Sequence, residues 1–194
     1  MPRALTEQEK CRQCQRLLEK GKAVVFSQGI RKTSVDDVAR AAGIAKGSFY
    51  QHFETKEKFM YELAWHIYRQ LFEQAERMLF NGDDIRVNLR KLLTNLFHMP
   101  EMIFFIHNNQ DITELCTSMP SREQQSDKKI EEAMFERLLV AAGIDIEKVK
   151  PGVVHNYIHA IYLTMGSDLM IKNEVPETCD QMMNSLTSYI CGGL

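Results

Sequence analysis

The chain has 194 residues, of which 44% are hydrophobic and 26% charged, with a formal net charge of −2. This composition is ordinary for a soluble globular protein of one or two domains, and it argues against disorder. The sequence has no apolar run of about 18 residues and no apolar stretch near its start, so we expect no membrane span, no secretory signal and a cytoplasmic location. The five cysteines are an odd number, which favours reduced thiols over a disulfide framework.

The charge is distributed unevenly along the chain. Residues 1–60 carry 12 Lys and Arg against 7 Asp and Glu, a net charge of +5. Residues 61–194 carry 12 against 19, a net charge of −7. A basic first part attracts phosphates, whereas an acidic remainder limits indiscriminate binding to polyanions.

Apolar residues recur at helical spacing along the chain, which predicts an all-α fold of about nine helices. Between the fifth and sixth helices, residues 100–106 form a short apolar segment suited to the interior. Residues 81–84, Asn-Gly-Asp-Asp, predict a turn followed by a helix cap. The expected helices span residues 7–28, 33–43, 45–53, 55–79, 85–97, a short stretch ending near 119, 121–142, 151–172, and a last stretch from about 175.

Residues 33–56, TSVDDVARAAGIAKGSFYQHFETK, have the pattern of two short helices joined by a tight turn. Thr33 and Ser34 are each followed three residues later by an acid, Asp36 or Asp37, so either pair could form a capping box. The first helix then has one apolar face, and the glycine after it suits the left-handed conformation that ends helices.

The second of these helices places Phe49 and Phe53 inward and leaves polar and small residues outward. Such an outward set suits a DNA duplex, because it combines a cation, hydroxyls and an amide with a glycine that allows close approach. For contacts to base edges we expect Lys46, Gly47, Ser48 and Gln51. For contacts to phosphates we expect Thr33, Ser34, Tyr50, His52 and Lys56.

The run VARAAGIAKGSFYQHFETKEKF resembles the DNA-reading head of the tetracycline repressor family of bacterial regulators. Capping hydroxyls, the turn glycine, Lys46-Gly47-Ser48, Tyr50 and Lys56 carry the resemblance. It covers about the first third of the chain; beyond that, only the all-helical layout is similar. The family implies a three-helix DNA-binding helix-turn-helix domain over residues 1–55 and an effector-binding and dimerisation domain over residues 56–194.

What the resemblance implies about function is a homodimeric repressor that leaves a palindromic operator in double-stranded DNA when a small, largely apolar molecule binds. No nucleophile elbow, phosphate loop or spaced carboxylate pair supports catalysis, so we expect neither an enzyme nor a cofactor. Methionine and aromatic side chains in the second domain favour an adaptable pocket. The residues expected to line it are Trp65, Tyr68, Phe72, Met102, Phe105, Met134, His159 and Tyr162.

Two long amphipathic helices end the chain, and the family uses such a pair to form a four-helix dimer interface. The residues expected at this interface are Val154, Ile158, Ile161, Met165, Met183, Leu186 and Ile190.

Two other patterns leave an alternative open, a metal- or redox-responsive regulator. His155 and His159 lie one helical turn apart and could ligate a metal together with His98 or His107 from another helix. No adjacent Glu and no Cys or carboxylate at a supporting spacing accompanies them, so we expect no metal. Cys11 and Cys14 form a CxxC inside a helix without a second CxxC nearby. A pair of semi-exposed thiols is the simpler interpretation, and a redox trigger is the alternative.

Overall fold

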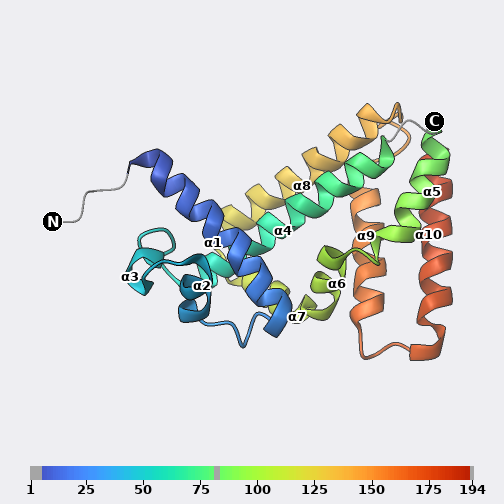
Figure 1. Cartoon of the computed structure of the whole chain (residues 1–194). Helices are drawn as coiled ribbons and strands as arrows, with labels where there is room; N and C mark the ends of the chain where they lie inside the picture. Colours follow the sequence, from blue (N-terminus) through green and yellow to red (C-terminus); the bar gives the residue numbers. More distant parts are fainter. Residues whose placement is uncertain (1–5, 81–83, 193–194) are drawn as a thin grey trace. The chain divides into compact units, whose positions relative to one another are not determined.

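A computed structural model describes residues 6–80 and 84–192. Over these ranges the chain forms ten α-helices, one short 3-10 helix and no strand, which confirms the all-α prediction (Figure 1). No helix in the described ranges is both long enough and apolar enough to cross a lipid bilayer. The helices are α1 (Glu7–Gln28), α2 (Val35–Ala42), α3 (Lys46–Phe49), α4 (Lys56–Leu79), α5 (Ile85–Leu96), α6 (Pro100–His107), α7 (Asn109–Ser118), α8 (Ser121–Ala141), α9 (Pro151–Gly166) and α10 (Val175–Cys191), with the 3-10 helix η1 at Lys172–Glu174.

Three elements differ from the sequence-based expectation. The apolar segment from Pro100 is itself a helix, α6, because proline suits the first helical position. Helix α9 ends at Gly166 instead of continuing to 172, since Ser167 takes an extended conformation. Helix α3 has only four residues, and turns follow it as far as His52. Of the expected turn at 81–84, the first three residues lie outside the described ranges, whereas Asp84 caps α5 by accepting from the backbone N–H groups of residues 86 and 87.

The chain divides into two compact units. One unit runs to Arg69 and includes Gln110–Cys116, and the other comprises Gln70–Asn109 together with the chain from Thr117. The division therefore falls inside α4 and inside α7. The boundary expected between residues 55 and 56 separates a DNA-binding from an effector-binding domain. It stays a prediction, because the division into compact units does not test which residues bind DNA.

The core of the first unit is built around three phenylalanine rings. Phe49, Phe53 and Phe59 lie with ring centroids 5.0 to 5.6 Å apart. Gly21 of α1 approaches this cluster so closely that a Cβ there would lie 2.5 Å from the Phe59 ring. The absence of a side chain at Gly21 thus lets α1 pack directly over the start of α4.

The second unit has one continuous core to which α4, α5, α6, α8, α9 and α10 contribute. Helices α9 and α10 pack side by side in opposite directions, and α5 lies against α10 (Figure 1). Asn88 of α5 is fully buried and donates to the Leu79 carbonyl at the end of α4, 3.1 Å away. This hydrogen bond satisfies one of the carbonyls that a helix end leaves open.

Candidate nucleic-acid interface

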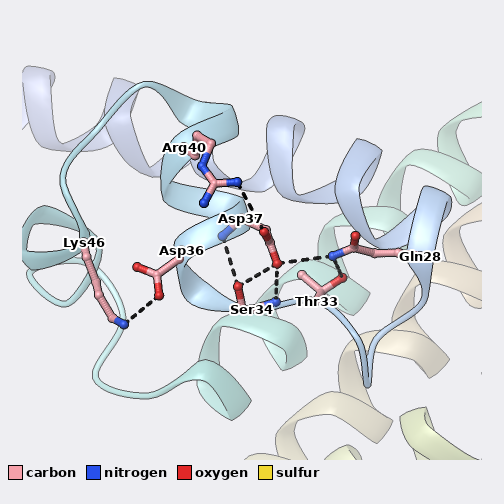
Figure 2. A network of polar contacts seen from close by, with 7 residues as sticks. All are labelled: Gln28, Thr33, Ser34, Asp36, Asp37, Arg40 and Lys46. Atoms are coloured by element: carbon pink, nitrogen blue, oxygen red, sulfur yellow. Dashed lines mark hydrogen bonds and ion pairs between the residues drawn. The ribbon is translucent and has the colours of Figure 1, made fainter.

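A network of side-chain hydrogen bonds fixes the start of α2 (Figure 2). The Ser34 hydroxyl accepts from the Asp37 backbone N–H, and the Asp37 carboxylate accepts from both the hydroxyl and the backbone N–H of Ser34 at 2.6 and 3.0 Å. Of the two capping pairs that the sequence allowed, Ser34 with Asp37 is the one formed. The bonds from Ser34 hold the pKa of the Asp37 carboxyl below its ordinary value.

Thr33 does not have the role expected from the sequence. Its side chain is 0% exposed, and its hydroxyl donates to the Gly29 carbonyl at 2.7 Å while accepting from Gln28 at 3.4 Å. A phosphate contact by Thr33 does not fit this burial, so that prediction is corrected. The hydroxyl instead ties the end of α1 to the start of α2. Sequence spacing alone could not separate Thr33 from Ser34, because both have an acid three residues later.

The turn between α2 and α3 depends on Gly43. This glycine has φ 66°, in the left-handed region, and its N–H bonds back to the carbonyls of Ala39 and Arg40. Three residues later α3 begins, and Phe49 at its end is 0% exposed. The buried ring fixes which way the helix faces.

Most of the residues expected to read bases lie on the outside of α3 and of the turn after it. Lys46, Gly47 and Gln51 are exposed and Ser48 is half-buried. A Cβ added at Gly47 would meet nothing within 4 Å, so the surface there is open to another molecule. Tyr50 is exposed, with its ring edge-on to Phe49 at 5.4 Å between centroids.

Two expected phosphate ligands are partly engaged within the chain. The His52 ring lies 2.9 Å from the Gln13 side chain, and burial lowers its pKa. Such an imidazole is mostly neutral at pH 7 and offers phosphate no charge. The Lys56 ammonium donates to the Arg31 carbonyl over 3.5 Å, at the start of α4.

Two ion pairs at this surface are not predicted by the sequence. Lys46 donates to Asp36 at 2.8 Å. Arg31, in the loop after α1, donates to Asp111 at 2.6 Å and lies 3.7 Å from Glu114, both in the part of α7 that belongs to this unit. The sequence carries no signal for the Arg31 pair, since its partners lie far along the chain. For Asp36, the spacing rule indicates only a capping role.

The residues expected to line an effector pocket fall in both units. In the first unit, the rings of Trp65 and Tyr68 pack edge to face with centroids 5.6 Å apart. The other six expected pocket residues lie in the second unit. In the second unit, rings follow one another from Phe72 through Phe135, His155 and His159 to Tyr162, with successive centroids 4.3 to 5.7 Å apart. Phe72, Met102 and Tyr162 are buried, whereas Phe105, Met134 and His159 are half-buried. A shallow hollow on α5, lined by Val87, Arg90, Lys91, Thr94 and Asn95, contains none of these residues.

The two histidines of α9 differ in their surroundings. His155 lies 3.2 Å from the Glu131 carboxylate, which raises its pKa. His159 is more buried, which lowers its pKa. Across residues 6–80 and 84–192 no group of three or more His, Cys, Asp or Glu side chains is arranged to hold a metal. Burial raises the pKa of Cys14, which reduces its thiolate fraction, so the metal- or redox-responsive alternative is not favoured.

Four residues expected at the dimer interface are buried within their own subunit: Val154, Ile161, Leu186 and Ile190. They belong to the core of the second unit, so their predicted intersubunit role is corrected. Ile158, Met165 and Met183 are half-buried at the edge of the same core. The exposed face of α9 carries Asn156, Ala160 and Leu163 instead.

A comparison with protein-family models matches residues 17–63 to the family described as "Bacterial regulatory proteins, tetR family". The matched segment contains α2, the turn, α3 and the aromatic cluster described above. Residues 17–63 therefore form a segment of the tetR family type.

Curated relatives match somewhat under half of this chain. The HTH-type transcriptional repressor KstR2 of Rhodococcus jostii (strain RHA1) is 35% identical over 81 residues, which are 42% of this chain and 40% of that protein. The HTH-type transcriptional repressor DhaR of Mycobacterium sp. (strain GP1) is 34% identical over 84 residues, 43% of this chain and 40% of that protein. The chain thus spans about two fifths of the length of these relatives.

Solved structures resemble the chain over nearly its whole length. A TetR-family transcriptional regulator from Pectobacterium atrosepticum has a TM-score of 0.69 at 17% identity, covering 98% of both chains. The multidrug binding protein EbrR, solved with imidazole, has a TM-score of 0.60 at 17% identity, covering 91% of this chain and 88% of that one. At such identity these matches establish the fold.

The capping network of α2 should contribute measurably to the free energy of unfolding. Replacing Ser34 with Ala removes the cap, so we expect the free energy of unfolding in urea at pH 7 to fall by about 1 kcal/mol. The matched control is Ser27→Ala, because the Ser27 hydroxyl only donates to a carbonyl within α1. An unchanged unfolding midpoint for Ser34→Ala would contradict the capping role.

The difference in stability between the wild type and Ser34→Ala should depend on pH. Because Ser34 lowers the folded-state pKa of Asp37, the stabilisation is complete above the ordinary Asp pKa of about 4 and is lost as pH falls through the lower folded value. The advantage of the wild type over Ser34→Ala should therefore shrink below about pH 4. An advantage that grows on acidification would show that the carboxylate is not the group involved.

Proposed function

We propose that this chain is a DNA-binding transcriptional regulator and that α3 with the following turn reads the duplex. The observation that carries the proposal is the outward display of Lys46 and Gly47 on α3 and of Tyr50 and Gln51 in the turn after it, with Phe49 fully buried. A recognition helix enters the major groove with its N-terminal residues leading, and these are the residues displayed. The relatives named as transcriptional repressors support repression as the output.

The proposed reading surface divides into two kinds of contact. Tyr50 and Lys56 bind phosphates and so position the protein on any duplex, whereas Lys46 and Gln51 contact base edges and so select a sequence. The Ser34 hydroxyl, already engaged in the cap, has a smaller part at a phosphate than the sequence implied.

Tyr50→Phe and Lys56→Ala should weaken binding to all duplexes alike. Lys56→Ala removes a cation, so it should also reduce the salt slope of log K by about 0.9 for each phosphate that the lysine neutralises. Gln51→Ala and Lys46→Ala should instead change the preference between sequences by about fivefold to a hundredfold. The measurement is fluorescence anisotropy with a duplex enriched by the wild type from a random-sequence pool and with its scrambled counterpart.

Lys20→Ala, which removes an exposed cation from α1, is the matched control for loss of charge. If all four variants of the proposed DNA contacts weakened binding equally to the enriched and the scrambled duplex, the division between positioning and base-reading residues would be refuted. A wild type that binds neither duplex would refute DNA binding itself.

We further propose that the second unit binds a small, largely apolar effector. The series of rings from Phe72 to Tyr162 and the half-buried Met134 give an adaptable apolar lining with an imidazole, His159, as a polar partner. The fold shared with a multidrug binding protein is consistent with this class of ligand. Since α4 and α7 each continue from one unit into the other, a ligand that favours one arrangement of these helices would change how two heads fit an operator.

The effector proposal is tested by thermal unfolding with a panel of apolar and aromatic compounds. A true ligand at about 100 times its Kd stabilises by about 2.7 kcal/mol, which raises the Tm by several degrees, and it should also weaken duplex binding. His159→Ala should reduce the shift, whereas Lys91→Ala in the hollow of α5 should not. No shift with any compound, or a shift without loss of DNA affinity, would contradict the proposal.

We propose a homodimer formed through the exposed face of α9. Leu163 is 48% exposed there, and the small Ala160 one turn earlier permits close approach of a second helix. The exposed residues of α10 are mainly polar, so α9 is the better apolar surface. A dimer carries two heads and therefore suits a palindrome.

Leu163→Glu should raise the dimer dissociation constant at least about tenfold, because burying an unpaired charge at an interface costs several kcal/mol. Light scattering coupled to size exclusion measures the mass over a dilution series. Ser188→Glu, which places the same charge on the exposed face of α10, is the control. An unchanged dimer for Leu163→Glu would place the interface elsewhere.

A further inference from the structure

The two adjacent acids at the start of α2 make different contacts (Figure 2). Asp37 turns toward Ser34 and Gln28 and completes the cap. Asp36 turns the other way, and its carboxylate accepts from the Lys46 ammonium at 2.8 Å. This ion pair joins the two helices of the helix-turn-helix, since Asp36 lies on α2 and Lys46 is the first residue of α3.

The pair lies at the surface that faces DNA in the proposed function. Both side chains are 53% exposed, so both are open to solvent. The carboxylate raises the pKa of Lys46, and the lysine is therefore charged at any pH at which the protein would meet DNA. Lys46 thus has a fixed counter-ion before any phosphate approaches.

Such a counter-ion affects non-specific DNA binding and sequence-specific DNA binding differently. Non-specific affinity comes from cations that replace the counter-ions condensed on phosphates. A lysine already paired with a carboxylate contributes little to that exchange. It still has donors for guanine O6 and N7, because an ammonium carries three N–H groups and a single carboxylate contact leaves others open.

We propose that Asp36 is a positioning residue that raises sequence specificity by acting through Lys46. Its carboxylate withholds the Lys46 charge from general phosphate attraction and directs the ammonium along the exposed edge of α3. Lys46 then adds to affinity only where a base edge presents acceptors. The inference rests on the proposed function, since it requires that this surface meet a duplex.

The test uses the full chain and four variants: Asp36→Asn, Asp36→Glu, Lys46→Gln and the double change Asp36→Asn with Lys46→Gln. Glu54→Gln is the charge-matched control, because Glu54 is an exposed acid of the same unit in the turn before α4. Affinity is measured against salt concentration for a duplex enriched by the wild type from a random-sequence pool and for a scrambled duplex of the same composition. Circular dichroism checks that each variant is folded, which the exposure of Asp36 and Lys46 favours.

Asp36→Asn should bind the scrambled duplex more tightly, with a salt slope steeper by about 0.9 for each head. Its preference for the enriched duplex should fall by about fivefold or more. Asp36→Glu, which keeps the carboxylate, should stay close to the wild type. Lys46→Gln should lose affinity mainly for the enriched duplex, and the double variant should match Lys46→Gln, because Asp36 acts through the lysine.

Two results would overturn the inference while leaving DNA binding intact. One is an equal gain for both duplexes in Asp36→Asn and Glu54→Gln, which would reduce Asp36 to a general repulsive charge. The other is an effect of Asp36→Asn that persists when Lys46 is already Gln. If the wild type binds neither duplex, the proposed function fails and this inference fails with it.

Discussion

The orientation of the proposed DNA-reading surface depends on the burial of one aromatic ring. Helix α3 has four residues and α2 has eight, and isolated helices shorter than about 12 residues are marginal in water. Neither helix is stable without tertiary packing. For α3, Phe49 supplies that packing, since its ring is 0% exposed and lies against Phe53 and Phe59, with ring centroids 5.6 and 5.2 Å away. With the ring held inside, the residues on the opposite side of α3 face outward.

Polar contacts fix the position of α2 next to this packed ring. The Ser34 and Asp37 cap fixes where α2 starts, and Thr33 ties that start to the end of α1. These groups are used within the chain, so the proposed DNA contacts come from the residues of α3 and the turn after it. Asp36, adjacent in sequence to a capping acid, takes no part in the cap and reaches Lys46 on the other helix. Two adjacent carboxylates therefore differ in role: Asp37 completes the cap of α2, and Asp36 pairs with Lys46, the lysine proposed to contact bases.

The sequence was sufficient for those features that arise within one helix. It predicted α1, α4 and the inward Phe49 and Phe53, because apolar spacing within a helix depends on nearby residues alone. Where two neighbouring residues satisfied one spacing rule, as with Thr33 and Ser34, it could not choose, since the choice is decided by burial against α1. Contacts between residues far apart in the sequence, such as Arg31 with Asp111, could not be predicted, because the spacing of neighbouring residues does not depend on them.

The dimer residues were difficult for a related reason. Val154 and Leu186 lie on apolar stripes of α9 and α10, and a stripe that faces the core of its own subunit has the same spacing as one that faces a second subunit. The structure resolves the ambiguity by burying both. Leu163, on the exposed face of α9, was predicted neither for the pocket nor for the interface.

Hydrogen–deuterium exchange of the full chain, with and without an enriched duplex, shows whether α3 and the turn after it contact DNA, because exchange reports which backbone amides become protected on binding. Residues 45–53 and the start of α4 should become protected, whereas the exposed loop at 168–171 should exchange unchanged. Protection confined to the second unit, with residues 45–53 exchanging as in the free chain, would contradict this prediction.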